Sequence, residues 1–94
     1  MYQIRPTKRF LKSLVKLKRG GLKQNAIVEI ERVIDALASG LKLDVSYRDH
    51  QLLGELADYR ECHIRGDLLL IYQIRENELV LVLIDVGSHN QLFG

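Results

Sequence analysis

Residues 59–86 read YRECHIRGDLLLIYQIRENELVLVLIDV, and this stretch decides the fold. Aliphatic, β-branched and aromatic residues recur in short runs that are separated by turn residues, which predicts three consecutive strands joined by tight turns. The expected strands are Tyr59–Ile64, Asp67–Arg75 and Glu78–Val86, and the expected turns are Arg65-Gly66 and Glu76-Asn77. The last two strands are apolar on both faces, so we expect them in the centre of a sheet that is covered on both sides.

The residues before this stretch predict one more strand and two helices. A short strand over Tyr2–Arg5 ends at Pro6, which cannot continue strand pairing. Thr7 can cap a first helix with an apolar repeat of helical period, and Gly20-Gly21 ends that helix. A second amphipathic helix is expected from about Leu22 to Ala38. Two antiparallel helices joined by a short glycine turn form a helical hairpin.

The expected order of elements is therefore β-α-α-β-β-β, followed by a short helical turn at the C-terminus. This order predicts an α+β fold in which the helical hairpin packs on one face of a largely antiparallel sheet. Residues 41–57 are expected to form an irregular connection. A chain of 94 residues can bury one core but not two, so residues 1–94 are expected to form a single domain.

The composition is that of a soluble globular protein, with 47% hydrophobic and 28% charged residues. No apolar run approaches the length of a membrane span, and the N-terminus lacks the core of a signal peptide. We therefore expect a cytoplasmic protein without a membrane partner. The single cysteine, Cys62, lies in an expected strand, which predicts a buried apolar side chain rather than a disulfide or a nucleophile.

The formal net charge of +2 conceals an uneven distribution along the chain. Residues 1–28 contain eight Lys or Arg and no Asp or Glu, whereas residues 29–94 contain six basic and twelve acidic side chains. Such a segment is either a solvated helix face or a surface that binds a polyanion. Lys8, Lys12 and Lys16 are four residues apart, so they share the exposed side of the first expected helix.

All three histidines, His50, His63 and His89, lie in the second half of the chain, each beside a turn or a strand end. Ser88 can cap the last helical turn, in which His89 and Phe93 are four residues apart and lie on one side. An imidazole beside an aromatic ring suits a proton-transfer group next to a bound base. The simpler alternative is that Phe93 fills the core and His89 is a solvated cap residue.

The first turn of the three-strand stretch sets which residues face one another. A three-residue loop, Ile64-Arg65-Gly66, would pair His63 with Asp67 and Cys62 with Leu68. This register keeps the apolar residues on one face of the sheet. We therefore expect His63 and Asp67 to be neighbours on the other face.

Three blocks of the chain together resemble the YafQ branch of the RelE/ParE toxin superfamily, the toxins of bacterial type II toxin–antitoxin pairs. The blocks are YRDHQLLG at 47–54, YRECHIRGDLLLIY at 59–72 and GSHNQLF at 87–93. The resemblance covers nearly the whole chain in the order of its elements. In the N-terminal half it consists only of the basic helical hairpin.

The resemblance implies an endoribonuclease that cuts messenger RNA in the A site of the 70S ribosome without a cofactor. It also implies a cognate antitoxin, of the DinJ or RelB type, that silences the toxin. The catalytic positions of the family fall on His50, His63, Asp67 and His89, with Phe93 as the aromatic partner.

The chain departs from the pattern of this family at two places. Leu68 stands where a tryptophan usually follows the aspartate, and Asp85-Val86 stands where Arg-Thr often precedes the Gly-Ser-His block. An aspartate cannot supply a phosphate contact at position 85. Arg60, Arg65 or the basic helices would have to supply it instead.

The residue types suit metal-free RNA cleavage independently of the family. The reaction needs a base for the ribose 2′-hydroxyl, a cation or donor for the phosphorane, and an acid for the leaving 5′-oxygen. Histidine can perform each task, and a carboxylate can orient a histidine. We expect His50 to be the base, Asp67 and His63 to orient and stabilise, and His89 to be the acid. The base and acid roles could be exchanged.

Two other functions compete with this interpretation. Three histidines and an aspartate could ligate zinc, although neither an HExxH nor a paired CxxC spacing is present. The same fold could also belong to a toxin without nuclease activity, like the ParE-type toxins that act on DNA gyrase, but the histidine-rich blocks argue against this. Cleavage in the presence of EDTA tests the first alternative, and gyrase-dependent DNA damage tests the second.

Overall fold

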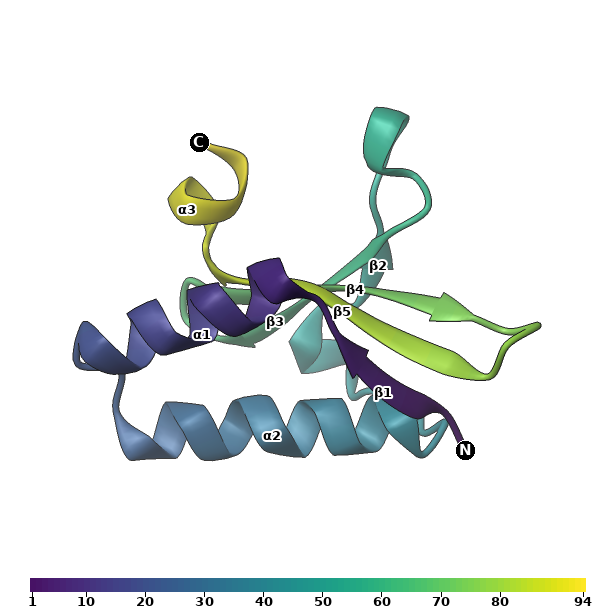
Figure 1. Cartoon of the computed structure of the whole chain (residues 1–94), viewed down its shortest axis with the longest axis horizontal. Coiled ribbons are helices and arrows are strands. Elements are labelled where there is room, and N and C mark those ends of the chain that lie inside the picture. The colour runs from purple at the N-terminus through teal and green to yellow at the C-terminus, as the bar shows by residue number, and fades with distance from the viewer.

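The computed structural model describes residues 1–94 as a five-stranded sheet with two long helices and a short C-terminal helix (Figure 1). The strands are β1 (Gln3–Pro6), β2 (His50–Gln51), β3 (Arg60–Arg65), β4 (Leu68–Arg75) and β5 (Val80–Ser88). The helices are α1 (Lys8–Arg19), α2 (Gln24–Ala38) and α3 (His89–Phe93), and the 3-10 helices are η1 (Val45–Tyr47) and η2 (Gly54–Leu56). The strand order is β1-β5-β4-β3-β2, and only β1 and β5 are parallel neighbours. The expected α+β fold class is confirmed.

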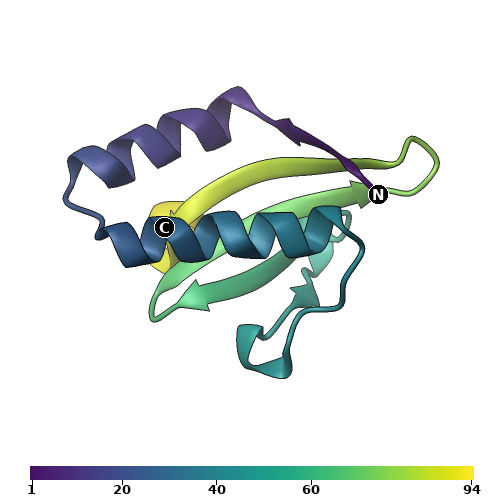
Figure 2. The same cartoon turned by 90° about the horizontal axis from the view of Figure 1, so that it is seen from below.

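The helical hairpin forms as expected, and its start is fixed by a side chain. Thr7 Oγ1 accepts a hydrogen bond from the Phe10 backbone N at 3.1 Å and donates to the Leu83 carbonyl at 2.8 Å, so the cap also ties α1 to β5. The chain reverses at Gly20-Gly21, where Gly21 has a φ of 95°, and α1 and α2 then run in opposite directions (Figure 2).

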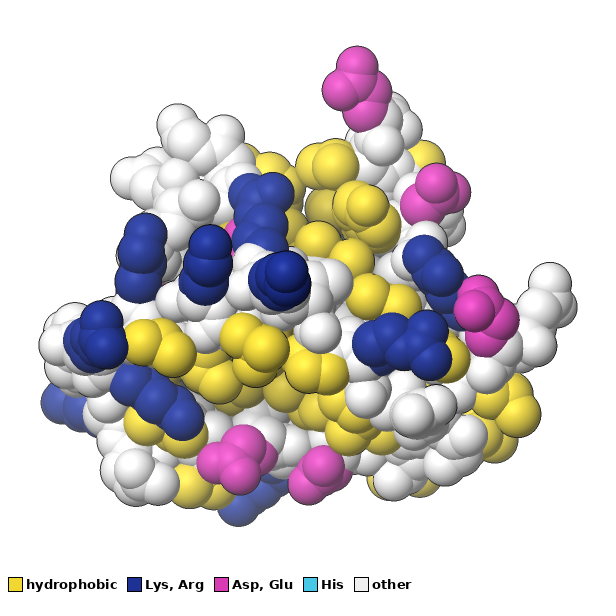
Figure 3. Space-filling model, in the orientation of Figure 1, with side chains coloured by type: hydrophobic (Ala, Val, Ile, Leu, Met, Phe, Trp, Pro, Cys, Tyr) yellow, Lys and Arg dark blue, Asp and Glu magenta, His cyan; other side chains and the backbone are white.

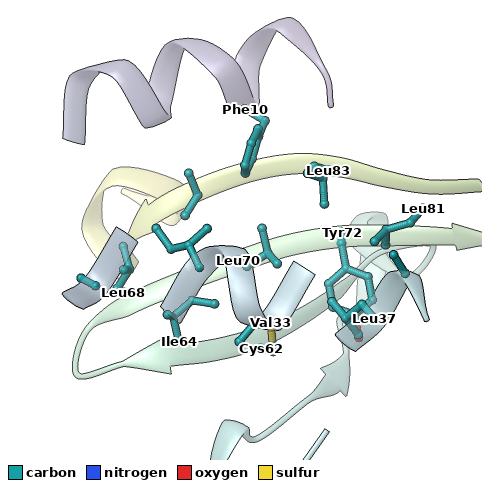
Figure 4. Packing of buried hydrophobic residues seen from close by; sticks show 14 residues of the cluster. Phe10, Val33, Leu37, Cys62, Ile64, Leu68, Leu70, Tyr72, Leu81 and Leu83 are labelled. Atoms are coloured by element: carbon teal, nitrogen blue, oxygen red, sulfur yellow. The ribbon is translucent and has the colours of Figure 1, made fainter. Parts of the chain in front are cut away.

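One face of the sheet, the inner face, packs on α2 and on Phe10, the one buried residue of α1 (Figure 4). α1 itself lies along β5. The buried residues of this core are Phe10, Ala26, Ile30, Val33, Leu37, Ala38, Cys62, Ile64, Leu68, Leu70, Tyr72, Leu81, Leu83 and Val86. The prediction for Cys62 is confirmed, because its side chain is buried and this burial raises the pKa of the thiol to about 12.

The expected register between the first two strands of the meander is wrong. The turn is Gly66-Asp67, and it joins Arg65 to its partner Leu68. A β-bulge between His63 and Arg65 adds a residue to β3, so His63 pairs with Leu69 and not with Asp67. Only Ile64 and Arg65 follow His63 in β3, which is too few residues for the apolar pattern to reveal the extra one.

Two further expectations are corrected. The connection between α2 and β3 is not wholly irregular, because His50 and Gln51 form β2 and His50 pairs with Glu61. The turn between β4 and β5 spans residues 76–79 rather than two residues, and Leu79 within it has a φ of 54°. β5 also carries a bulge, because Ile71 pairs with Asp85 and Tyr72 with Leu83.

The opposite face of the sheet, the outer face, is hollowed. α3 and the loop around β2 and η2 rise on either side of it (Figure 1), and hydrophobic side chains are visible in the hollow between them (Figure 3). The buried residues Leu69, Ile71, Val80 and Val82 belong to this face, since they alternate along β4 and β5 with residues of the inner core. None of the helices has the length and apolar character that crossing a membrane requires.

Candidate active site

A row of four paired residues crosses the outer face from β2 to β5. His50 pairs with Glu61, Glu61 pairs with Ile71, and Ile71 pairs with Asp85. Paired residues project to the same side of a sheet. The Cα atoms of the two acidic residues in the row, Glu61 and Asp85, are therefore separated by two strand spacings, or about 10 Å.

Glu61 is the centre of the first cluster, although it is not among the residues that the sequence predicts for the site. Its Oε1 lies 3.6 Å from His50 Nε2 and 3.5 Å from His63 Nε2, and the two imidazole centroids are 6.4 Å apart. The Glu61 side chain is only 7% exposed. Burial of a carboxylate costs free energy unless cations or donors compensate it, and such arrangements are typical of acid-base sites. The available signal was the spacing of Glu61 and His63, which places both on one face of a strand.

The backbone fixes which nitrogen of His50 carries the proton. His50 Nδ1 lies 2.7 Å from the Arg48 carbonyl oxygen, which can only accept a hydrogen bond. In the neutral ring, Nδ1 is therefore protonated and Nε2 has the lone pair. Arg48 adopts a left-handed conformation, with a φ of 50°, which non-glycine residues adopt only where the surroundings impose it. His50 Nε2 is thus the atom that can accept a proton from a substrate.

A second cluster is built on α3. The Ser88 side chain accepts from the Gln91 backbone N at 3.2 Å, and the Gln91 side chain accepts from the Ser88 backbone N at 2.7 Å, which forms a capping box. The His89 and Phe93 ring centroids are 5.1 Å apart, so the expected contact between these side chains is confirmed. Asp67 Oδ1 accepts from the His89 backbone N at 3.4 Å. Asp67 therefore belongs with His89 and not, as expected, opposite His63.

The two clusters lie on either side of β4. His63 pairs with Leu69, and Leu69 pairs with Gly87, which is two residues before His89. Leu69 and Ile71 form an apolar floor between the clusters. Three histidines and two carboxylates thus lie on either side of two buried apolar side chains, an arrangement that suits proton transfer to and from a bound nucleotide.

A family model described as "Bacterial toxin of type II toxin-antitoxin system, YafQ" matches residues 2–94. This chain belongs to the YafQ toxin family. The "mRNA interferase toxin YafQ" of Escherichia coli (strain K12) is 37% identical over 54 residues, which is 57% of this chain and 56% of that protein. The alignments with curated relatives span only 39% and 56% of those proteins' own lengths.

Solved toxin structures match over the full chain. The metal-bound toxin from Helicobacter pylori is 41% identical with a TM-score of 0.86, and the alignment covers 99% of this chain and 100% of that one. The toxin chain in the E. coli DinJ-YafQ complex is 25% identical with a TM-score of 0.85 and full coverage of both chains. In the present chain no group of three or more His, Cys, Asp or Glu side chains is placed to hold a metal ion.

Two arginines that were expected to contact the substrate lie away from the histidines in this YafQ toxin. Arg60 pairs with Tyr72 of the inner core and bonds Asp49 at 3.2 Å, because alternate residues of a strand face opposite sides. Tyr72 also donates to Asp49, and burial, followed by this bond, raises the pKa of Tyr72. The network anchors Asp49, the residue before His50. Arg65 lines a cavity with residues of α2 instead.

The three lysines expected on one side of the first helix of this toxin do lie together. Lys8, Lys12 and Lys16 line a cleft that also includes Gln91 of α3. A row of Lys and Arg side chains is visible over α1, beside α3 (Figure 3). Positive charge therefore borders the helix that carries His89 and Phe93.

Proposed function

We propose that this toxin is an endoribonuclease that cleaves messenger RNA in the ribosomal A site by acid-base attack of the ribose 2′-hydroxyl. The observation that carries the proposal is the buried Glu61 carboxylate between the imidazoles of His50 and His63. On the other side of β4, the His89 imidazole lies beside the Phe93 ring. The name of the E. coli relative, mRNA interferase toxin, supports the same substrate class.

His50 is the base in this mechanism. Its Nε2 takes the proton of the 2′-hydroxyl, while the Arg48 carbonyl holds Nδ1–H and so fixes the ring. Proton transfer makes His50 an imidazolium, and Glu61 Oε1 lies 3.6 Å from the nitrogen that receives the proton. The attraction between Glu61 and His50 is therefore stronger in the transition state than in the ground state, which is the condition for catalysis.

The remaining side chains act on the phosphorane and the leaving group. His63, which lies 3.5 Å from the same carboxylate oxygen, donates to the phosphorane. His89 protonates the leaving 5′-oxygen, and Phe93 offers its ring to a nucleotide base beside it. Asp67 holds the backbone N of His89 and thereby the start of α3. The roles of His50 and His89 can be exchanged without changing the set of groups.

The proposal includes two macromolecular partners besides messenger RNA. We propose that the first is a cognate antitoxin of the DinJ or RelB type, which is supported by membership of a toxin-antitoxin family and by the structure of the E. coli DinJ-YafQ complex. The 70S ribosome is the second partner, and Lys8, Lys12 and Lys16 are proposed to face its RNA, because phosphate backbones attract clustered cations. Action on ribosomes places the toxin in the cytoplasm.

Mapping of new 5′ ends on messenger RNA, after expression of the toxin in bacteria, tests the proposal. Ends in phase with codons are expected, and cleavage in vitro should be measured with and without EDTA. His50→Ala, Asp67→Ala and His89→Ala should each lower the cleavage rate by roughly two to four orders of magnitude. Asn90→Ala is the matched control on α3, because Asn90 is exposed and its side chain makes no hydrogen bond.

Growth arrest that persists unchanged in all three folded variants would show that these residues are not catalytic. Intact messenger RNA together with gyrase-dependent DNA damage would favour the ParE-like alternative. Thermal unfolding of each variant separates lost chemistry from lost structure. Leu70→Ala provides the contrast, because removal of this fully buried side chain should cost about 2 to 5 kcal/mol of stability.

A further inference from the structure

Asp85 is the second buried carboxylate of the protein, and the mechanism above gives it no role. The residue is 4% exposed. It accepts hydrogen bonds from Arg9 Nε at 2.8 Å, from Ser13 Oγ at 2.5 Å and from the Val86 backbone N at 2.8 Å. Two of these donors come from α1, which is distant in sequence. A carboxylate so far from water is stable only because it is paired in this way.

Arg9 is held by Asp85 through one nitrogen only. No hydrogen bond within the chain uses its two terminal nitrogens, and its side chain is 68% exposed. The guanidinium therefore presents its other N–H groups to solvent in a planar fork that matches two oxygens of a phosphate. The bond to Asp85 orders this long side chain before any ligand arrives, so less entropy is lost on binding.

Arg9 lines the cleft between α1 and α3. The cleft has a volume of about 440 Å³ and no hydrophobic lining residue. Its lining residues are Lys8, Arg9, Lys12, Ser13, Lys16, Asp85 and Gln91. Four cations against one carboxylate, with no apolar side chain, fit a phosphodiester backbone and not an apolar or cationic ligand.

The cleft begins where the row of paired residues from the histidine cluster ends. Asp85 is the last residue of that row, and two strand spacings, or about 10 Å, separate it from Glu61. We propose that Arg9, positioned by Asp85 and Ser13, binds a phosphate that flanks the cleaved bond in the substrate RNA strand. Arg9 is then a substrate-binding residue and Asp85 a positioning residue. The inference rests on the proposed function and names a substrate contact for it.

Binding of an uncleavable RNA to the full toxin tests the inference without using cleavage as the readout. The probe is a short single-stranded oligonucleotide with every 2′-hydroxyl methylated, measured across a salt series. Arg9→Gln should raise Kd by about tenfold, as expected for the loss of one charge-assisted hydrogen bond. The slope of log affinity against log salt should fall by about 0.7. Lys18→Gln removes the same charge from the opposite side of α1, outside the cleft, and should have a smaller effect.

Asp85→Asn distinguishes a positioning role of Asp85 from mere neutralisation of the cleft, because the two roles predict opposite changes in RNA affinity. Removal of a negative charge from a basic cleft would tighten RNA binding if Asp85 only neutralised its surroundings. We expect weaker binding, and we expect Arg9→Gln with Asp85→Asn to bind no more weakly than Arg9→Gln alone. Ser13→Ala, which loses one bond to Asp85 without a change of charge, serves the same purpose if Asp85→Asn fails to fold.

Equal affinity of the parent and Arg9→Gln, including undetectable binding by both, would overturn the inference. So would tighter binding by Asp85→Asn. If Arg9→Gln weakened binding only to ribosomes that lack messenger RNA, Arg9 would contact ribosomal RNA and not the substrate strand, and the inference would also be wrong. If the oligonucleotide affinity depends on Arg9 but no messenger RNA is cut, the phosphate site stands and the proposed nuclease function falls.

Discussion

Tyr72→Phe is a one-atom test of how the inner core supports the candidate active site. The Tyr72 ring is 1% exposed, and its hydroxyl donates to Asp49 and accepts from Arg60 Nε at 3.4 Å. The substitution keeps the ring in the core and removes only the oxygen. Asp49 precedes His50 in the chain, so the loss should affect both the stability of the fold and the position of His50.

The size of the effect follows from the groups that remain. A hydrogen bond to a charged group contributes about 1.5 to 3 kcal/mol net. Asp49 keeps its ion pair with Arg60 at 3.2 Å, and its side chain is 24% exposed, so water can replace part of the lost bond. We therefore expect the free energy of unfolding to fall by about 1 to 2 kcal/mol, which lowers Tm by about 5 to 15 °C in a domain of this size.

Urea unfolding at neutral pH measures this loss, and the slope of the free energy of unfolding against urea concentration should not change. Tyr59→Phe is the matched control, because the Tyr59 hydroxyl makes no hydrogen bond within the chain. Its free energy of unfolding should stay within about 0.5 kcal/mol of the parent value. Cleavage by Tyr72→Phe should fall several-fold, although the atoms of all three histidines are untouched. Equal stability of the two Phe variants would refute the reasoning that Tyr72 anchors Asp49.

Three further predictions concern the thiol, the C-terminal helix and the buried glutamate. Burial raises the pKa of Cys62 from 9.0 to about 12, so the unfolded chain loses the thiol proton at a lower pH than the folded chain does. The free energy of unfolding should therefore fall by about 1.4 kcal/mol per pH unit between these two values. In urea titrations, the free energy of unfolding of Cys62→Ala should fall less steeply over the same pH range. Ser88→Ala removes the cap of a five-residue helix that is not stable alone, at a local cost of about 1 kcal/mol, so cleavage should fall with little change in Tm and Ser88→Thr should restore it. Glu61→Gln should lower the cleavage rate by about two orders of magnitude. The free energy of unfolding should stay equal or rise by up to about 1 kcal/mol, because the variant loses a buried charge that is poorly compensated. A loss of stability in denaturant titrations would contradict this.

Local patterns were enough to predict the elements and several of the contacts of the site. The helical repeat and Thr7 predicted α1, the apolar runs predicted the central strands, and Ser88 predicted the helix that brings His89 and Phe93 together. These features depend on residues that are close in sequence. The family resemblance, which the full-length match confirms, rests on blocks that are also local.

The pairings across the sheet could not be predicted in the same way. β2 has only two residues, too few to produce a periodic signal, yet it brings His50 to Glu61. The bulge in β3 replaced the expected contact between His63 and Asp67 with one between Asp67 and the His89 backbone. Glu61 was overlooked because an acidic residue in a strand usually faces water, and only the pairing of β2 with β3 shows that it is buried between two histidines.

The bulge in β5 shows how packing and function are decided together. Leu81 and Leu83 belong to the inner core, so strict alternation would place Asp85 in that core, where an unpaired carboxylate is costly, and Val86 on the outer face. Ile84 is the extra residue between Leu83 and Asp85, and it reverses both assignments. Val86 enters the core, and Asp85 turns to Arg9 and Ser13 at the edge of the sheet. The same shift aligns Asp85 with Glu61 and aligns Gly87 with His63, so the proposed phosphate contact and the start of α3 reach the outer face through one irregularity in a strand.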